Sequence, residues 1–261
     1  MKIFLPLILP FLLLAKEHMV QVEPFETYHI KSSVAASVTE AKTALEGKNV
    51  KNALAVKMDD KSDKIRLKSL IKKRKALLKT LKIEQENLTN LRRLKEIKKR
   101  NYERIKNLST KSQYEKEQRL SDYLNANSLY LNQMSKIENL KIQLADIESS
   151  IGVLKDTIAK KSIYLSGYVY KIYPKKGDFV AMGAPLADVA DTSRAKVTLY
   201  LDREELKNID KKSIYIDGKR SDVEIYIKKI IPDKVHITQY EVQMIIPKPK
   251  IFGNLVKVEI K

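Results

Sequence analysis

The sequence has no cysteine, no tryptophan and only seven glycines in 261 residues. Without cysteine the chain can neither form a disulfide nor carry a lipid on a thiol, which excludes lipoproteins and disulfide-stapled scaffolds. Few glycines together with 32% charged residues are typical of long solvent-exposed helices rather than of a large enzyme core. The composition therefore favours a protein that works through extended surfaces.

Motifs that carry catalytic or metal chemistry are also missing from the sequence. The three histidines, His18, His29 and His236, have no spacing that resembles a metal site. Neither a Gly-rich phosphate loop nor a Gly-x-Ser-x-Gly elbow is present. We therefore predict that the protein is not an enzyme and holds no cofactor or metal.

The long apolar run near the N-terminus, residues 3–15, follows Lys2. A positive residue, a short apolar stretch and a small residue at its end are typical of a secretory signal peptide. The run is too short to span a bilayer, and Pro6 and Pro10 weaken it as an anchor helix. We expect residues 1–15 to be a signal peptide that is cleaved, leaving the chain in the periplasm; a retained anchor is the alternative.

Two long stretches have apolar residues at alternating spacings of three and four, which predicts two helices. In residues 61–108 the stripe is Leu67, Leu70, Leu77, Leu81, Leu88, Leu91, Tyr102 and Ile105. In residues 113–160 it is Leu120, Tyr123, Tyr130, Met134, Ile137, Leu140, Leu144, Ile147, Ile151, Leu154 and Ile158.

Both stripes have irregularities. Arg74, Glu84 and Lys95 interrupt the first stripe, and we expect the stems of these long side chains to cover apolar surface. In the second stripe the step from Ile137 to Leu140 is three residues where four would keep the heptad. This step predicts a local stammer.

The residues between the two stretches predict a turn. Residues 109–112 read Ser-Thr-Lys-Ser, and Ser112 with Glu115 forms a capping-box sequence at the start of the second helix. Two helices of nearly equal length joined by about four residues should fold back as an antiparallel hairpin over residues 61–160. A dimerising coiled coil is the alternative, although it needs neither matched arms nor a capped turn.

The positive charge is concentrated in the first helix. Residues 61–108 carry eighteen Lys or Arg against five Asp or Glu, whereas residues 113–160 carry six against seven. Nucleic acid is disfavoured as a partner, because the chain is expected to be exported and has no aromatic stacking platform. We interpret the charge as a basic solvated face, with an acidic protein or an anionic membrane surface as the alternatives.

A loose internal repeat flanks the predicted hairpin. Its two copies are Gly47-x-x-Val50-x-x-Ala53-x-x-Val56 and Gly177-Asp178-x-Val180-x-x-Gly183-x-x-Leu186, and each follows a β-rich stretch, residues 34–38 and 163–172. The glycines suit left-handed turn positions between short strands. The repeat predicts two similar half-domains, one on each side of the hairpin.

After residue 191 the pattern predicts strands and one short helix. The expected strands are residues 195–201, 223–231, 235–246 and 255–260. Asp202 can cap a helix over residues 203–209, and Asp217-Gly218 is a hairpin-turn signal. A small β-barrel is the natural closure for these strands.

This arrangement of a split β-domain, a coiled-coil hairpin and a small barrel resembles the membrane fusion proteins, the HlyD-like periplasmic adaptors of tripartite efflux pumps and type I secretion systems. The resemblance implies an α+β fold. Its expected parts are the first half of a lipoyl-like domain (20–60), the α-helical hairpin (61–160, tip about 109–112), the second lipoyl-like half (161–191) and a β-barrel domain (192–261).

The resemblance also implies a function and partners. In this family the hairpin reaches toward an outer-membrane channel and the β-domains pack on an inner-membrane transporter, usually as a trimer or hexamer. The family's tip motif is Arg-x-x-x-Leu, then six residues and a Ser. Arg104 and Leu108 match its first two positions, but Glu115 stands where the Ser should be. With Lys111 and Ser112 these residues form the predicted partner-binding tip.

Two other functions compete with the adaptor. One is a self-associating structural coiled-coil protein of the cell envelope, which the matched arms do not exclude. The other is a lipoyl or biotinyl carrier, because Lys57 falls where such a domain presents its modified lysine. A carrier lysine must sit on a tight exposed turn, whereas Lys57 is followed by about one hundred residues of predicted helix.

Overall fold

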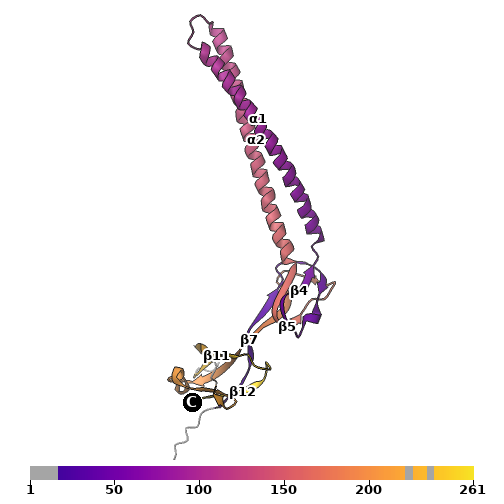
Figure 1. The fold of residues 1–261 in the computed structure, drawn as a ribbon, viewed down its shortest axis with the longest axis vertical. Coiled ribbons are helices and arrows are strands. Elements are labelled where there is room, and N and C mark those ends of the chain that lie inside the picture. Colours follow the sequence, from indigo (N-terminus) through magenta and orange to yellow (C-terminus); the bar gives the residue numbers. More distant parts are fainter. Residues whose placement is uncertain (1–16, 221–225, 234–237) are drawn as a thin grey trace, which may run out of the picture. The chain divides into compact units, whose positions relative to one another are not determined.

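The computed structural model describes residues 17–220, 226–233 and 238–261 (Figure 1). The predicted signal peptide, residues 1–15, lies outside the described residues, and so do parts of the strands expected at 223–231 and 235–246. The fold is α+β, with a long helical hairpin and antiparallel sheets, as predicted. None of the described helices is both long and apolar enough to cross a membrane.

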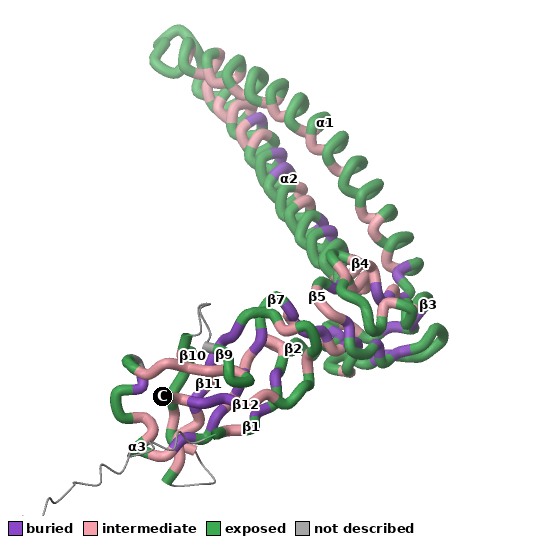
Figure 2. The backbone as a smooth tube through the Cα atoms, turned by 60° about the horizontal axis from the view of Figure 1, so that its bottom comes forward, coloured by how far each residue is buried: buried purple, intermediate pink, exposed green. Residues whose placement is uncertain are grey.

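The chain divides into two units, and the first of them, residues 58–162, is the hairpin. Its helices are α1 (Lys61–Ile105) and α2 (Gln113–Lys160). They run side by side in opposite directions (Figures 1 and 2). The pairs Arg74–Glu148 and Lys98–Asp122 connect them, each at 3.0 Å. The predicted antiparallel hairpin is confirmed.

The charged residues that interrupt the α1 stripe lie in the seam of the hairpin and bind α2. Together with the apolar stripe and Lys98 they complete an alternation of three and four from Leu67 to Ile105. The contacts are Arg74 Nε with Glu148 Oε1 (3.0 Å), Lys136 Nζ with Glu84 Oε1 (2.6 Å) and Lys95 Nζ above the Tyr130 ring (4.6 Å to its centre). The three interrupting side chains therefore make polar contacts between the helices, in addition to any apolar surface that their stems cover.

The α2 seam contains a buried glutamine that its apolar stripe misses. Gln133 is 7% exposed, whereas Met134, the predicted seam residue, is 40% exposed. With Ala126 and Gln133 the alternation of three and four runs unbroken from Tyr123 to Ile158, so the stammer predicted at Ile137 was wrong. Figure 2 shows the buried positions along α2. A reading restricted to apolar residues places Met134 in the seam, because it cannot recognise a polar seam residue.

The buried Gln133 side chain has a hydrogen-bond partner on α1 for both its amide nitrogen and its amide oxygen. Its Nε2 donates to the backbone O of Glu84 at 3.0 Å and to Glu84 Oε2 at 2.7 Å. Its Oε1 accepts from Asn87 Nδ2 at 3.3 Å. Lys136 and Gln133 hold the pKa of the Glu84 carboxyl below its ordinary value by binding the ionised form. We call Gln133, Glu84, Asn87 and Lys136 the polar layer of the hairpin.

The two open ends of the hairpin are tied together. The Met58 backbone N donates to Lys161 O at 2.8 Å. Lys161 Nζ donates to the backbone O of Asp59 at 2.8 Å and also binds the Asp63 carboxylate. The chain therefore leaves the hairpin beside the point at which it enters, so the insertion does not force the flanking strands apart.

The second unit contains the strands on both sides of the hairpin. They form an eight-stranded sheet in the order β10-β11-β7-β5-β4-β3-β6, with β2 also paired to β7, and a four-stranded sheet in the order β1-β12-β8-β9. The strands are β1 (Glu17–Gln21), β2 (Glu23–Lys31), β3 (Ala36–Ala41), β4 (Asn49–Met58), β5 (Ser162–Ile172), β6 (Phe179–Val180), β7 (Pro185–Asp202), β8 (Ile214–Ile216), β9 (Lys219–Arg220), β10 (Tyr226–Pro232), β11 (Gln239–Pro247) and β12 (Leu255–Ile260).

The two copies of the sequence repeat make equivalent backbone contacts, each with the opposite side of the insertion. Val38, before the hairpin, donates to Asp178 O at 2.8 Å and accepts from Gly177 N at 2.9 Å. Val169, after the hairpin, donates to Lys48 O at 3.0 Å and accepts from Gly47 N at 2.9 Å. Both glycines have positive φ, +74° and +97°. The repeat is therefore a reciprocal exchange between the two halves.

Strand β7 pairs with β2 along its first part and with β11 along its second part. Residues 185–196 pair with β2, with an irregularity in the register, and residues 194–202 pair with β11. Every second residue of the later segment, Ala195, Val197, Leu199 and Leu201, is fully or almost fully buried. The backbone strand continues through Asp191, where the sequence placed a boundary between domains.

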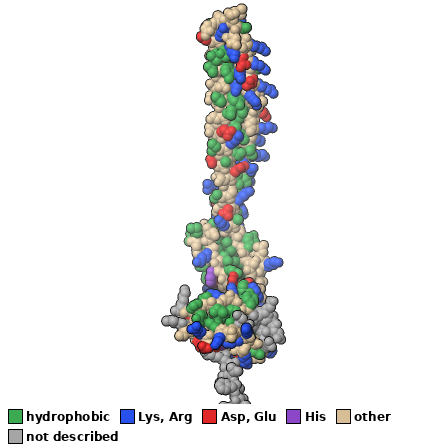
Figure 3. All heavy atoms as spheres, turned by 90° about the vertical axis from the view of Figure 1, so that its left-hand side faces the viewer, with side chains coloured by type: hydrophobic (Ala, Val, Ile, Leu, Met, Phe, Trp, Pro, Cys, Tyr) green, Lys and Arg blue, Asp and Glu red, His purple; other side chains and the backbone are tan. Residues whose placement is uncertain are grey.

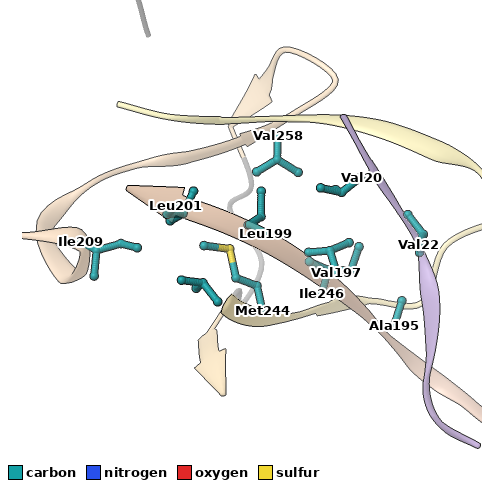
Figure 4. Close-up of a cluster of buried hydrophobic side chains, with 11 residues drawn as sticks. Val20, Val22, Ala195, Val197, Leu199, Leu201, Ile209, Met244, Ile246 and Val258 are labelled. Carbon is teal, nitrogen blue, oxygen red and sulfur yellow. The ribbon is translucent and has the colours of Figure 1, made fainter. Parts of the chain in front are cut away.

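The alternating residues of β7 belong to one apolar cluster (Figure 4). Its buried members are Val20, Val22, Ala195, Val197, Leu199, Leu201, Ile209, Val242, Met244, Ile246 and Val258. The location of Val20 and Val22 differs from the prediction, in which the first β-domain starts at residue 20. They join this cluster because β1 pairs with the C-terminal strand β12.

The local signals after β7 are found in the structure. Asp217 and Gly218 connect β8 to β9 with φ of +48° and +76°, as a two-residue hairpin turn requires. Helix α3 (Arg203–Leu206) follows Asp202, whose backbone N donates to Glu205 Oε2 at 3.0 Å. The helix is shorter than the expected 203–209, because Asn208 takes a left-handed conformation before the 3₁₀ turn at Ile209–Lys211.

Gly167 in β5 is a glycine that the sequence repeat did not single out. Its φ is +120°, and a Cβ there would lie 2.7 Å from the backbone O of Ala190 and 2.9 Å from Val189 Cγ1. Both atoms belong to β7, so neither can move without disturbing the sheet. A side chain at this position is therefore excluded by backbone conformation and by space.

We predict that Gly167→Ala lowers the free energy of unfolding by about 2 kcal/mol or more, because strain and a close backbone contact act together. Gly152→Ala is the matched control: Gly152 lies in α2 with open space around its Cα, so alanine should stabilise the chain by about 1 kcal/mol. Denaturant unfolding followed by circular dichroism measures both changes. Equal tolerance of the two substitutions would contradict the close packing of β5 on β7.

We predict that Gln133→Ala lowers the free energy of unfolding of the hairpin by about 1–3 kcal/mol, because the hydrogen bonds of this buried side chain to Glu84 and Asn87 are lost. Met134→Ala, one residue along the same helix, should change it by about 0.5 kcal/mol or less. Thermal unfolding followed by far-UV circular dichroism compares the two variants. A larger loss of stability for Met134→Ala than for Gln133→Ala would place Met134 in the seam, as the apolar pattern predicted.

Candidate partner-docking site

The turn between α1 and α2 carries the predicted contact residues. Helix α1 ends at Ile105, and the Lys106 backbone N donates to Tyr102 O at 3.0 Å. Leu108 N then donates to Ile105 O at 3.0 Å, and Lys111 N donates to Leu108 O at 3.4 Å. These successive backbone bonds give the turn a defined path from one helix to the other.

Ser112 and Glu115 begin the second helix with the predicted capping box. Ser112 Oγ accepts from the Glu115 backbone N, and Glu115 Oε2 accepts from the Ser112 backbone N, both at 3.2 Å. The other oxygen of Glu115 accepts from Lys111 Nζ at 3.2 Å. Both carboxylate oxygens are therefore engaged within the turn, which explains why an acid suits this position.

The contacts of Glu115 make the cap dependent on its ionised form. The Lys111 ammonium, then the Ser112 backbone, hold the pKa of the Glu115 carboxyl below its ordinary value. A carboxyl with a lowered pKa stabilises the folded state above its ordinary pKa and loses this effect as the pH falls through the lowered value. The cap is thus complete at neutral pH and weakens only in acid.

The other three side chains at the tip, those of Arg104, Leu108 and Tyr114, are exposed. Leu108 is 45% exposed, and Arg104 is exposed and forms no ion pair with any residue that the structure describes. Tyr114 is 75% exposed in the first turn of α2 and was not among the predicted site residues. The sequence feature that could have identified Tyr114 is its position before Leu120, the residue at which the apolar stripe of α2 begins.

Arg104, Leu108 and Tyr114 together give the end of the hairpin a cation, an aliphatic group and an aromatic ring. A guanidinium can donate in a fork to a carboxylate or to backbone carbonyls at a helix end. Arginine and tyrosine are also the residue types most enriched among energetically important interface contacts. The arrangement can bind a protein surface, and it offers no nucleophile paired with a base.

Two of the three histidines have structural partners. His18 Nε2 lies 2.8 Å from Glu205 Oε1, and His29 Nδ1 lies 2.7 Å from Asp188 Oδ1. His236 is outside the described residues. Within the described part of the chain no group of three or more His, Cys, Asp and Glu side chains could hold a metal ion. Lys57, the candidate carrier lysine, lies inside strand β4.

No family model matches the sequence, and no curated protein matches it. Solved structures do match the fold. MacA from Actinobacillus actinomycetemcomitans is similar over 95% of this chain and 79% of its own, with a TM-score of 0.63 and 16% sequence identity. The membrane fusion protein Spr0693 from Streptococcus pneumoniae R6 is similar over 94% of this chain and 99% of its own, with a TM-score of 0.59 and 11% identity.

A putative efflux transporter from Bacteroides eggerthii DSM 20697 is similar over 95% of this chain and 68% of its own, with a TM-score of 0.53 and 12% identity. These likenesses include both the helical hairpin and the strands on its two sides, because each covers nearly the whole chain. At such low identities they establish the fold alone. The chain therefore has the fold of the membrane fusion proteins, as the resemblance in its sequence predicted.

Proposed function

We propose that the protein is a periplasmic adaptor subunit of an efflux or secretion system and that it links an inner-membrane transporter to an outer-membrane channel without catalysing a reaction. The observation that carries this proposal is the hairpin of 45 and 48 residues, inserted into a fold shared with a membrane fusion protein. The putative efflux transporter from Bacteroides eggerthii, which has the same fold, supports a role in efflux.

We assign the β-structure of the second unit to two domains. Residues 23–60 and 161–191 form a lipoyl-like domain split by the hairpin, and residues 192–261 together with β1 form a small β-barrel domain. The reciprocal contacts of Val38 and Val169 support the first assignment, because the two half-domains hold each other closed. The apolar cluster shared by β1, β7, β11 and β12 supports the second.

The dimensions of the hairpin suit a docking arm. At 1.5 Å per residue each helix is about 70 Å long, and its narrow tip offers little surface to a partner. Stable protein interfaces usually bury about 1,200 Å² or more in total. Several tips acting together would reach this area, so we propose that the protein works as a ring-like trimer or hexamer whose weak single contacts add up by avidity.

We propose that the tip residues Arg104, Leu108, Lys111, Ser112 and Glu115 contact the channel, with Tyr114 added from the structure. Arg104 and Leu108 present free polar and apolar groups for this contact. Ser112 and Glu115 act by holding the turn, because their hydrogen-bonding groups are engaged in the cap. Lys111 shares its ammonium between Glu115 and solvent.

The proposal predicts that a photoreactive residue in place of Lys111 crosslinks an outer-membrane protein in intact cells. Loss of the Lys111–Glu115 contact leaves the two backbone bonds of the capping box, so the turn should keep its conformation. The same photoreactive residue in place of Ser149, exposed near the other end of α2, is the matched control and should not capture that protein. Mass spectrometry identifies the captured proteins.

Two outcomes contradict the bridging model. Capture of the inner-membrane transporter alone at Lys111 would place the tip on the wrong side of the assembly. Capture of other copies of the hairpin and of no membrane protein would favour the self-associating structural protein of the cell envelope.

A further inference from the structure

A half-open cavity of about 710 Å³ lies within the second unit. It is bounded by the segment where β1 passes into β2, by β5, by the middle of β7 and by the loop between β11 and β12. No residue of the hairpin lines it. Small-molecule sites usually measure about 300–1,000 Å³, so the cavity has room for a compound of that size.

The cavity lies where the pairing of β2 with β7 is irregular. Pro24 pairs with Ala195 and Glu26 pairs with Asp191, so two steps along β2 correspond to four along β7. Thr192 lies in this extra length of β7 and lines the cavity. Irregular pairing of this kind is frequent next to functional sites, where it re-aims a side chain or ends the pairing.

Residues 250–252, in the loop between β11 and β12, form one wall of the cavity. The chain directly after this wall is tied to the start of β2. Gly253 N donates to Val22 O at 2.8 Å, and Val22 N donates to Asn254 O at 2.9 Å. Phe252 also packs against the apolar cluster of the strands. The wall is therefore held in place by the fold itself, without a ligand.

The apolar part of the lining is aromatic and aliphatic. Tyr168 and Tyr170 of β5 meet edge to face, with ring centres 5.3 Å apart and planes at 74°. Tyr170 is 45% exposed, and Ile251 on the loop is 62% exposed. Phe252 is half-buried. Aromatic rings bind one another by offset stacking or by edge-to-face contact. The lining therefore suits a ligand with a flat ring system.

The free charge of the cavity is positive. Lys196 Nζ lies 3.5 Å from Glu23 Oε2, so these two lining charges offset each other. Lys250 is exposed, and no carboxylate in the described part of the chain forms an ion pair with it. Basic side chains are common on this protein, and Figure 3 shows many along one edge of the hairpin. Lys250 is set apart from them by its place in the lining of a cavity.

We propose that this cavity binds an organic anion with a flat ring system, such as an aromatic carboxylate or sulfonate. The ring lies against Tyr170 and Phe252, and the anionic group meets the Lys250 ammonium. A cation is disfavoured, because Lys250 repels it and Glu23 is already neutralised by Lys196. The site contains neither the tip nor any other part of the hairpin, so the proposal does not depend on the adaptor function.

The probe is anilinonaphthalene sulfonate, a flat aromatic anion whose fluorescence rises in apolar surroundings. Its neutral counterpart, N-phenylnaphthylamine, has the same rings without the sulfonate. Both are titrated into the full chain at an ionic strength of about 0.15 M, which screens scattered surface charges beyond about 8 Å. Calorimetry gives the number of sites. We expect one site per chain for the sulfonate and at least tenfold weaker binding of the neutral compound.

Two pairs of matched variants locate the site. Lys250→Gln removes the free charge, and Lys248→Gln makes the same change two residues earlier, outside the lining. Tyr170→Ser removes a ring of the cavity, and Tyr164→Ser removes an exposed ring of the same strand that does not line it. All four side chains are exposed, so the fold should persist, and circular dichroism checks this.

We expect Lys250→Gln to weaken binding of the sulfonate at least fivefold and Tyr170→Ser at least tenfold, whereas each control should change it less than twofold. Four results would overturn the proposal. Equal affinity for the neutral compound would show that no positive charge takes part. Equal losses for the two lysine variants would assign the binding to net charge. Equal losses for the two tyrosine variants would place the probe outside the cavity. Several equivalent sites per chain would assign it to the basic surface as a whole.

Discussion

Four backbone hydrogen bonds, two at Val38 and two at Val169, hold together parts of the chain that are separated by the entire hairpin. Each valine is almost fully buried, so water cannot replace these bonds without opening the sheet around them. The exchange allows about a hundred residues to be inserted in the β-structure, because these bonds join the two halves directly across the insertion. The bond between Met58 and Lys161 extends this closure to the first residues of the insertion.

The sequence predicted those parts of the fold that depend on local or periodic patterns. The two helices, the Ser112–Glu115 cap and the Asp217-Gly218 turn all follow from residues within one turn or from regular spacing. The reciprocal contacts could be anticipated only as a repeat, because spacing along a chain does not say which copy binds which. Strand β1 was missed since its partner β12 lies at the other end of the chain.

The seam between α1 and α2 gives a second example of contacts that a local sequence pattern does not predict. A stripe drawn through apolar residues locates a helix correctly, yet it places Met134 in the interface where the structure has Gln133. The buried glutamine is stabilised by three hydrogen bonds to α1, and these partners are some fifty residues away in the sequence. At the tip, the family resemblance pointed to Arg104 and Leu108. Tyr114 could be identified only from the exposure of its side chain in the structure.

The polar layer has a mechanical consequence for the hairpin. Apolar seams tolerate small axial slips, since one leucine can replace another against a neighbouring helix. A slip of one helical turn, about 5.4 Å, would instead carry Gln133 away from Glu84 and Asn87 and leave buried polar groups facing aliphatic side chains. Arg74 with Glu148 and Lys98 with Asp122 resist the same slip on either side of it. The two helices should therefore move as one rod, so that a push at one end is transmitted to the other without shearing between them.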